Sequence, residues 1–511
     1  MASLEEIRAG RIKKLQKLRE AGVDSYPAKT ARDFEIAQLI KDFENLQKEN
    51  KTVTIAGRIM ALRLQGAIGF ADIFDGTGEI GKFQIFLKKG EGIDEKDFDL
   101  FTETVDIGDF IEVTGTLFVT KREEKTLQVS GWKMLTKSLR PLPEKWHGLQ
   151  DMEERYRRRY LDFLMDKELR ELIIKKSKFW DVVRNFFKEK GFLEVETPTL
   201  ELTTGGAEAR PFKTHHNDFD LDMYLRISVG ELWQKRLMAA GFPKTFEIGR
   251  VYRNEGTSPE HLQEFTNMEF YWGYANYRDG MNLVKELYQT IAKSVFGQTQ
   301  FEYNGHTFDL ADEWPEIDYA EEIKKQTGID IEKASEKEIK EKLKTLEISY
   351  EGNNRERLLD TLWKHCRKNI SGPAFLINHP VLVAPLAKKT SSTQENNAPQ
   401  PPLTTRGGEE KFDSKMDRVQ MFQPIIGGSE VGRGYSELND PIDQRERFEM
   451  QQKLIEKGDE EAMMPDFEFV EMLEYGMPPT CGFGFGERLF AILAGKPLRE
   501  LQTFPLMRPT E

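Results

Sequence analysis

The sequence predicts an α+β protein in which a small N-terminal β-barrel precedes a larger domain of mixed strands and helices. Residues 51–140 contain five short runs of alternating or β-branched residues, separated by Gly, Asp and charged turns. A proline-marked linker follows, and beyond it helical and strand patterns are interspersed. Five strands in about ninety residues are typical of a barrel of the oligonucleotide-binding type, whereas sandwiches generally have more strands.

The composition is that of a globular intracellular protein. The chain has 511 residues, of which 38% are hydrophobic and 32% charged, and this length indicates several domains. Its two cysteines, Cys366 and Cys481, are too few for a disulfide framework and are not spaced as zinc ligands. The N-terminal stretch carries acidic residues where a signal peptide has an apolar run, and no apolar run is long enough to span a membrane. We therefore expect a cytoplasmic protein with no membrane partner.

The net charge of −13 is distributed unevenly. Residues 1–140 contain 23 basic residues (10 in 1–50, 13 in 51–140) and 23 acidic residues (9 and 14), so the acidic excess lies in 141–511. Residues 5–19 place six Lys/Arg among two Glu, with apolar residues at roughly helical spacing. This stretch is either a solvated amphipathic helix or a basic helix that contacts a polyanion. Net charge alone therefore does not exclude a nucleic-acid partner.

The domain organisation follows from these patterns. We expect, in order, a helical extension over 1–50, the barrel over 51–140, a linker over 141–150 and the larger domain over 151–511. Within the larger domain, residues at about 310–375 are predicted to form a Lys/Glu-rich helical insertion. The polar segment 388–411, rich in Pro, Gly, Ser and Thr, is predicted to be a mobile loop.

The first candidate for chemistry is a run of alternating glycines from Gly482 to Gly486. Its spacing matches neither a phosphate loop nor a dinucleotide fingerprint, and close packing of a helix on a sheet would also explain it. Arg488, one turn into a predicted helix, could place a guanidinium over a bound phosphate or base.

The second candidate is a predicted hairpin at 246–274. On the outgoing strand Arg253 and Glu255 share one face, because side chains alternate. On the returning strand a common face holds Phe265, Asn267, Glu269 and Tyr271. Such a hairpin offers a cation for a phosphate or carboxylate, an aromatic platform and carboxylates. A surface ion pair across the hairpin is the alternative interpretation.

Together, the two clusters and the strand that ends at Pro198 resemble the three motifs of class II aminoacyl-tRNA synthetases. Longer stretches closely resemble class II lysyl-tRNA synthetases: RPLPEKWHGLQDMEERYRRRYLD, GFLEVETP, GGAEARPFKTHHNDFDLDMYLRIS and EYGMPPTCGFGFGERL. The resemblance runs through about 1–310 and 417–511, and the insertion between them is matched weakly.

The resemblance implies an antiparallel sheet flanked by helices and an enzyme that activates lysine with ATP and Mg²⁺. The enzyme would then esterify the 3′ end of tRNA(Lys), while the barrel reads the anticodon. A homodimer with the segment around Pro198 at its interface is also implied. Three alternatives stay open: an aspartyl- or asparaginyl-tRNA synthetase, a lysine-activating paralogue (such relatives typically lack the barrel), and a non-catalytic RNA-binding or regulatory relative.

The resemblance also implies roles for individual residues. The catalytic residues would be Arg253 and Arg488. The ATP site would comprise Arg253, Glu255, His261, Phe265, Glu430, Gly486 and Arg488. The lysine site would comprise Gly206, Glu231, Arg253, Glu269, Tyr271, Arg433, Tyr435 and Glu437. The anticodon would be read by Arg58, Phe70 and Gln84, and the metal ligands would be Glu430 and Gln423.

Three residues depart from the family pattern. Arg433 replaces an uncharged residue, often Asn, and could hold the substrate carboxylate more strongly or swing away. Gln423 replaces a frequent glutamate ligand and offers only one neutral oxygen to Mg²⁺. Glu260 precedes His261 where an arginine is frequent, so triphosphate contacts would be redistributed.

Overall fold

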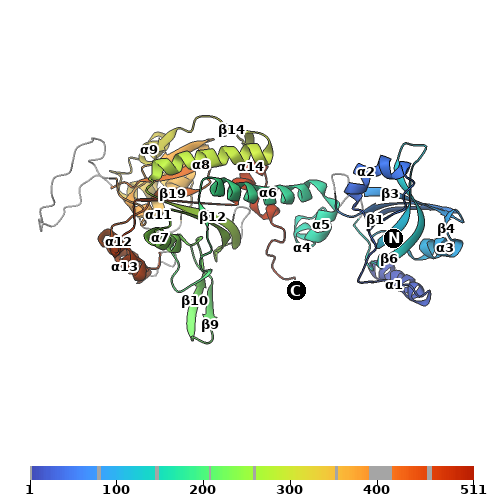
Figure 1. Cartoon of the computed structure of the whole chain (residues 1–511). Coiled ribbons are helices and arrows are strands. Elements are labelled where there is room, and N and C mark those ends of the chain that lie inside the picture. The colour runs from blue at the N-terminus through green and yellow to red at the C-terminus, as the bar shows by residue number, and fades with distance from the viewer. Residues whose placement is uncertain are drawn as a thin grey trace, which may run out of the picture. The chain divides into compact units, whose positions relative to one another are not determined.

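The computed structural model describes residues 3–77, 82–143, 149–205, 209–256, 261–350, 355–390, 417–456 and 463–510. Gly206, Glu260 and most of the predicted loop at 388–411 lie outside the described residues. The chain forms two compact units, Met1–Arg155 and Tyr156–Glu511 (Figure 1). In the described parts of the chain, no helix has the length and apolar character needed to cross a bilayer.

The first unit contains a closed ring of five strands, as the sequence predicts. Strand β1 pairs with β2 and β5, β5 pairs with β6, β6 pairs in parallel with β3, and the β2–β3 pair closes the ring. The strands are β1 (Val53–Gln65), β2 (Ile68–Phe74), β3 (Lys82–Lys89), β5 (Phe110–Val119) and β6 (Lys125–Thr136), with β4 (Gly92–Ile93) added beside β3. The helices are α1 (Leu4–Glu20), α2 (Ile36–Lys48) and α3 (Glu95–Thr104).

Helix α1 is held against its unit by its own cations. Arg11 is largely buried and donates to backbone carbonyls of the unit, while Lys14 lies 2.6 Å from Asp106 and Lys17 pairs with Glu103. Three of the six basic residues counted in 5–19 therefore make contacts within the protein. For these three residues, contacts within the protein explain the basic side chains, and no polyanion is needed.

The second unit is built on a large mixed sheet, ordered β15-β16-β17-β19-β20-β12-β11-β7. Its inner pairs are antiparallel, as the resemblance implies, and the two edge pairs, β15–β16 and β11–β7, are parallel. The strands are β7 (Leu193–Glu194), β11 (Lys244–Tyr252), β12 (Glu264–Gly273), β15 (Glu316–Asp318), β16 (Ala374–Ile377), β17 (Met421–Ile426), β18 (Ser429–Glu430), β19 (Arg433–Ser436) and β20 (Thr480–Gly486). Outside this sheet lie β8 (Leu200–Glu201), β9 (Lys213–His216), β10 (Leu221–Leu225), β13 (Gln300–Tyr303) and β14 (His306–Asp309).

Helices cover the sheet so that one face is closed and part of the other stays open. Side chains of α6 and α8 pack with Met268 and Phe270 of β12 in the largest apolar core. On the other face, α7 packs against Tyr271. The helices are α4 (Met152–Arg157), α5 (Arg159–Met165), α6 (Lys167–Glu189), α7 (Glu231–Ala239), α8 (Tyr277–Ile291), α12 (Pro441–Glu456), α13 (Phe467–Glu474) and α14 (Arg488–Ala494). Shorter turns are η1 (Ala292–Phe296), η2 (Arg367–Asn369), η3 (Val381–Val383) and η4 (Leu498–Leu501).

The region predicted to be a helical insertion contains three helices that share an apolar core. It contains α9 (Tyr319–Thr327), α10 (Glu336–Thr345) and α11 (Arg355–Cys366), whose buried side chains pack with Leu376 and Ile425 of the sheet.

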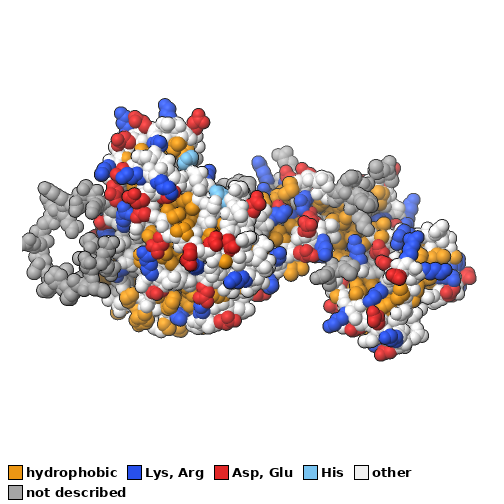
Figure 2. Space-filling view, turned by 90° about the horizontal axis from the view of Figure 1, so that it is seen from above, with side chains coloured by type: hydrophobic (Ala, Val, Ile, Leu, Met, Phe, Trp, Pro, Cys, Tyr) orange, Lys and Arg blue, Asp and Glu red, His pale blue; other side chains and the backbone are white. Residues whose placement is uncertain are grey.

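On the visible surface, basic and acidic side chains are interspersed (Figure 2). The acidic excess of the larger domain therefore does not form one uniform acidic face in this view.

Candidate active site

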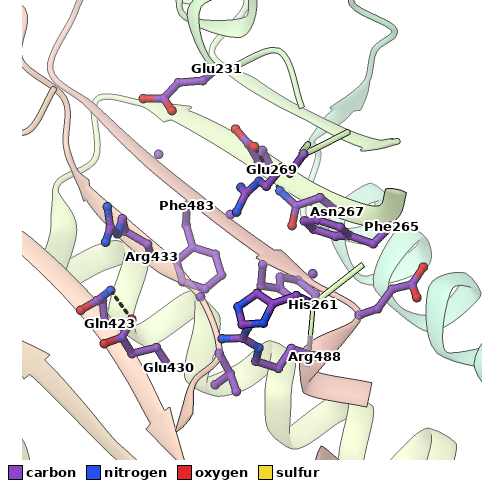
Figure 3. Close-up of a pocket in the computed structure, with 18 of the residues that line it drawn as sticks. Glu231, His261, Phe265, Asn267, Glu269, Gln423, Glu430, Arg433, Phe483 and Arg488 are labelled. Atoms are coloured by element: carbon purple, nitrogen blue, oxygen red, sulfur yellow. Dashed lines mark hydrogen bonds between the residues drawn. The ribbon is translucent and has the colours of Figure 1, made fainter. Parts of the chain in front are cut away.

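A cavity of about 530 Å³ opens on the sheet face opposite α6 and α8 (Figure 3). Strand β12 forms its floor, because Asn267, Glu269 and Tyr271 line the cavity while the residues between them point into the core. Phe265 also lines it, so the predicted common face of the returning strand is confirmed. A surface ion pair across a hairpin does not describe this buried arrangement.

The glycine run lies in strand β20. Phe483 and Phe485 of this strand are buried, and the strand pairs with β12 along its length. A Cβ on Gly482 would lie 2.1 Å from Oε1 of Glu437, and a Cβ on Gly484 would lie 2.8 Å from Cγ of Glu269. The glycines therefore leave room for the carboxylates of the cavity. Arg488 is the first residue of α14, not one turn into it as the sequence suggested.

One end of the cavity gathers cations around an aromatic ring. The guanidinium of Arg253 lies 5.3 Å from the centre of the Phe265 ring and is held by the carbonyl of Ile227, with its Nη2 at 3.3 Å. Arg488 and His261 line the same region, as Figure 3 shows. Such a site suits a planar base beside anionic groups.

The opposite end gathers three buried carboxylates and two phenols. Glu269 accepts from the backbone N–H of Val229 at 2.7 Å and from the Tyr271 hydroxyl at 3.1 Å. Burial, helped by repulsion from Glu231, raises the pKa of Glu269 to about 7. Burial raises the pKa of Glu437 to about 8 although a neighbouring lysine opposes the shift. Acids perturbed in this way are typical of functional sites.

Glu231 and Tyr435 belong to the same cluster. Both line the cavity, and the Tyr435 hydroxyl donates to Oε1 of Glu231. Arg433, four residues before Glu437, also lines the cavity; its backbone pairs with Gly484. The cavity therefore combines an acidic end with arginines nearby.

Glu430 is held by hydrogen bonds on both oxygens. Trp363 of α11 donates its Nε1–H to Oε1 at 2.7 Å, and Gln423 donates its amide N–H to Oε2 at 3.1 Å. The carbonyl oxygen of Gln423 lies 2.8 Å from Nε2 of His379, which is buried. Gln423 therefore presents a donor, not a second carboxylate, to Glu430. Among the described residues, no group of three or more His, Cys, Asp or Glu is placed to hold a metal ion.

All the described residues expected at the ATP, lysine and metal sites line this one cavity, while Gly206 lies outside the described residues. Sequence reasoning missed Arg357, Asp360 and Lys364 of α11, which also line it. Their spacing places them on one helix face. Nothing in the sequence, however, indicated that this face turns toward the cavity.

The three residues expected to read the anticodon lie on one outward face of the barrel. Strand pairing places Arg58 opposite Phe74, Phe70 opposite Phe86, and Gln84 opposite Asp72. The Phe70 and Phe86 rings lie 4.8 Å apart, and Phe118 lies 5.8 Å from Phe86. Sequence reasoning missed these two further aromatic residues. The guanidinium of Arg58 lies over the Phe110 ring, 4.2 Å from the centre of that ring.

Comparison with known proteins agrees with this architecture. Residues 151–508 match the family described as tRNA synthetases class II (D, K and N), and residues 53–135 match the OB-fold nucleic acid binding domain. The lysine–tRNA ligase of Roseiflexus sp. (strain RS-1) is 41% identical over 514 residues, covering 99% of this chain and 100% of the relative. That of Thermotoga maritima is 40% identical over 512 residues (99% and 97%). That of Carboxydothermus hydrogenoformans is 42% identical over 514 residues (99% and 99%).

Proposed function

Because this chain belongs to the class II lysyl-tRNA synthetase family, we propose that its cavity binds lysine and ATP side by side and forms lysyl-adenylate. The chain is a lysine–tRNA ligase, an ATP-dependent aminoacyl-tRNA synthetase. In the proposed first step, the lysine carboxylate attacks the α-phosphate and pyrophosphate leaves. In the second step, a ribose hydroxyl at the 3′ end of tRNA(Lys) attacks the lysyl carbonyl, an ester forms and AMP leaves.

The observation that carries this proposal is the buried oxygen Oε1 of Glu437, which has no hydrogen-bond partner among the described residues. The residue is 2% exposed and lines the cavity. A buried carboxylate oxygen without a partner is costly, and a substrate ammonium would supply one. Glu269 and Tyr271 lie on the floor beside it and would complete the site for the lysine side chain.

The remaining lysine contacts follow the same chemistry. Glu231 and Gly206 would hold the α-amino group, with Tyr435 orienting Glu231 through its hydroxyl. Arg253 would bridge the carboxylate and the α-phosphate. Arg433 is exposed and lines the cavity, so it is the second cation that we assign to the carboxylate.

The ATP contacts lie at the cationic end. Phe265 would stack on the adenine, with Glu255 and Gly486 beside it, and His261 and Arg488 would hold the outer phosphates. No protein nucleophile is needed, because the substrate carboxylate attacks. Catalysis then consists of positioning two anions together and neutralising their charge, which fixed guanidinium groups do well.

Mg²⁺ is expected to arrive with ATP, and Glu430 is the residue that we propose to contact it. Mg²⁺ is commonly held by one or two carboxylates together with substrate phosphates, which a single glutamate at the cavity wall satisfies. The cation would neutralise phosphate charge there. Gln423 fits this role less well, because its amide N–H and carbonyl oxygen are both engaged.

The decisive test of this function is ATP–pyrophosphate exchange measured with each of the twenty amino acids. We expect exchange with lysine only. Aspartate should be inactive, because Glu269 and Glu437 repel its acidic side chain. Asparagine should be inactive as well, because its neutral amide does not supply the cation that these two carboxylates need. Exchange that prefers aspartate or asparagine would show that the pocket is misassigned, and no exchange with any amino acid would favour a non-catalytic relative.

On the barrel, we propose that the anticodon binds the outward face that carries Phe70, Gln84 and Arg58. The partly exposed Phe70 packs against Phe86 in a tilted arrangement and offers an aromatic surface for a base. Gln84 accepts a hydrogen bond from Thr126 at 3.0 Å, and its amide nitrogen can donate to a base edge.

Phe70→Ala should weaken tRNA charging without affecting lysine activation. Loss of one base–aromatic stack costs roughly 1–3 kcal/mol, so KM for tRNA(Lys) should rise roughly 5- to 150-fold. Aminoacylation kinetics measure this rise, and pyrophosphate exchange should stay at the wild-type rate. Val119→Ala, at an exposed position of β5, is the control. An equal loss in both reactions would indicate a damaged fold and no anticodon role.

We also propose that the chain forms a homodimer through the segment around Pro198. Leu193, Leu200 and Leu202 expose 49%, 43% and 57% of their surface, which supports an apolar contact there. Sedimentation velocity measures this directly, and a monomer at micromolar concentration would exclude it.

A further inference from the structure

A lysine of the protein itself lies beneath the acidic end of the cavity. Lys235, on α7, is 1% exposed, and its Nζ lies 2.8 Å from Oε1 of Glu231 and 2.6 Å from Oε2 of Glu437. These are two of the three carboxylates to which we assign the substrate's ammonium groups. Lys235 itself does not line the cavity, so it contacts these carboxylates from behind.

The surroundings of Lys235 keep its ammonium charged. Burial opposes the charge, but Glu231 and Glu437 outweigh it, so the pKa of Lys235 is raised. Aromatic rings surround the same nitrogen, with centres at 5.9, 5.6 and 5.8 Å, from Tyr271, Tyr435 and Phe469. Carboxylates and ring faces are the partners that bind an ammonium group well. The raised pKa of Glu437, about 8, still lies below the raised pKa of Lys235, so the proton stays on Lys235.

The charges of this end can be counted. Glu231, Glu269 and Glu437 carry up to three negative charges, and the buried Lys235 supplies one positive charge. The phenols of Tyr271 and Tyr435 are neutral, since burial raises their pKa well above the usual value. Two negative charges therefore remain to be balanced when all three carboxylates are ionised. Free lysine brings two ammonium groups.

We propose that Lys235 is a specificity-determining positioning residue, a permanent cation that sets the pocket's charge to match an amino acid with two ammonium groups. This inference rests on the proposed function of the cavity. Lys235 pairs with Oε2 of Glu437, whose Oε1 has no hydrogen-bond partner among the described residues, so in this proposal it also orients the carboxylate for the substrate. Without Lys235, Glu231 and Glu437 would repel each other, and one of them would take up a proton.

The test is the pH dependence of kcat/KM for lysine in pyrophosphate exchange. In the wild type it should rise with pH as Glu269, with a pKa of about 7, and Glu437, with a pKa of about 8, lose their protons. Lys235→Met removes an opposite charge, which raises the pKa of a nearby acid by roughly one to three units. We therefore expect the midpoint to move to higher pH by about one unit or more, and KM for lysine at pH 7 to rise at least roughly tenfold.

Matched variants separate charge from structure. Arg236→Met removes the next cation of the same helix, which pairs with Asp466 at 2.9 Å outside the cluster, and should leave the pH profile unchanged. Lys235→Arg should keep the wild-type midpoint and Lys235→Gln should shift it, and these two decide the matter if Lys235→Met no longer binds ATP. An unchanged profile in an ATP-binding Lys235→Met or Lys235→Gln, or equal shifts in Gln and Arg variants, would overturn the proposal. A wild type that does not activate lysine would overturn the proposed function itself.

Discussion

Arg253→Ala is expected to abolish lysine-dependent ATP–pyrophosphate exchange. The guanidinium lies between the Phe265 ring and the carbonyl of Ile227, and in the proposed binding mode it bridges the substrate carboxylate and the α-phosphate. Removing one fixed donor to a developing charge costs roughly 10²–10³ in rate, and Arg253 serves two anions at once. We therefore expect a loss of at least about 10³-fold in kcat, measured by exchange at saturating lysine and ATP.

The control for this variant lies on the strand that leads to the site. Arg250 is exposed on β11 and does not line the cavity, so Arg250→Ala should retain wild-type exchange. Circular dichroism of both variants verifies that the fold is intact. Exchange near the wild-type rate in Arg253→Ala would mean that this arginine is not the bridging cation.

Gly482→Ala should damage lysine binding although it removes no functional group. The added Cβ would lie 2.1 Å from Oε1 of Glu437 and 2.6 Å from a ring carbon of Tyr271, so both side chains must shift. Overpacking of this kind costs roughly 1–3 kcal/mol, and here the cost falls on the pocket for the substrate ammonium. We expect KM for lysine to rise roughly 5- to 150-fold, with little change in KM for ATP.

Gly131→Ala provides the comparison, because a Cβ at this position on β6 meets no atom within 4 Å. Exchange kinetics should be the same as in the wild type. A Gly482→Ala enzyme with an unchanged KM for lysine would show that Glu437 and Tyr271 do not bind the substrate side chain. A rise in both KM values would instead indicate a general disturbance of the sheet.

The parts of the fold that local patterns determine could be predicted from the sequence. Alternation fixed the common face of Phe265 and Glu269, because strand side chains point to opposite faces regardless of tertiary context. The glycine run was harder, because its strand depends on partners more than 200 residues away, such as Glu269 opposite Gly484. Its glycines are explained by the side chains they make room for, and those become visible only once β12 and β20 pair.

Long-range contacts that involve ordinary residues could not be predicted. Lys235 looks like any helical lysine in the sequence, and only the approach of Glu437 from a distant strand makes it a buried cation. The same holds for Gln423. Its departure from the family's glutamate is visible in the sequence, but the orientation of its amide depends on its contact with His379. Motifs predict which residues contact lysine and phosphate. They do not predict residues such as Lys235 and His379, which contact those residues and hold them in place.

The hydrogen bond from Trp363 to Glu430 has a consequence for how this protein can evolve. The insertion was matched only weakly by its sequence motifs, yet Trp363 of α11 is the donor to one oxygen of Glu430, at 2.7 Å. A lineage that replaces this tryptophan leaves that oxygen without its donor, so such a change should persist only with a compensating change nearby. The side of the insertion that carries Trp363 is therefore expected to evolve together with the cavity.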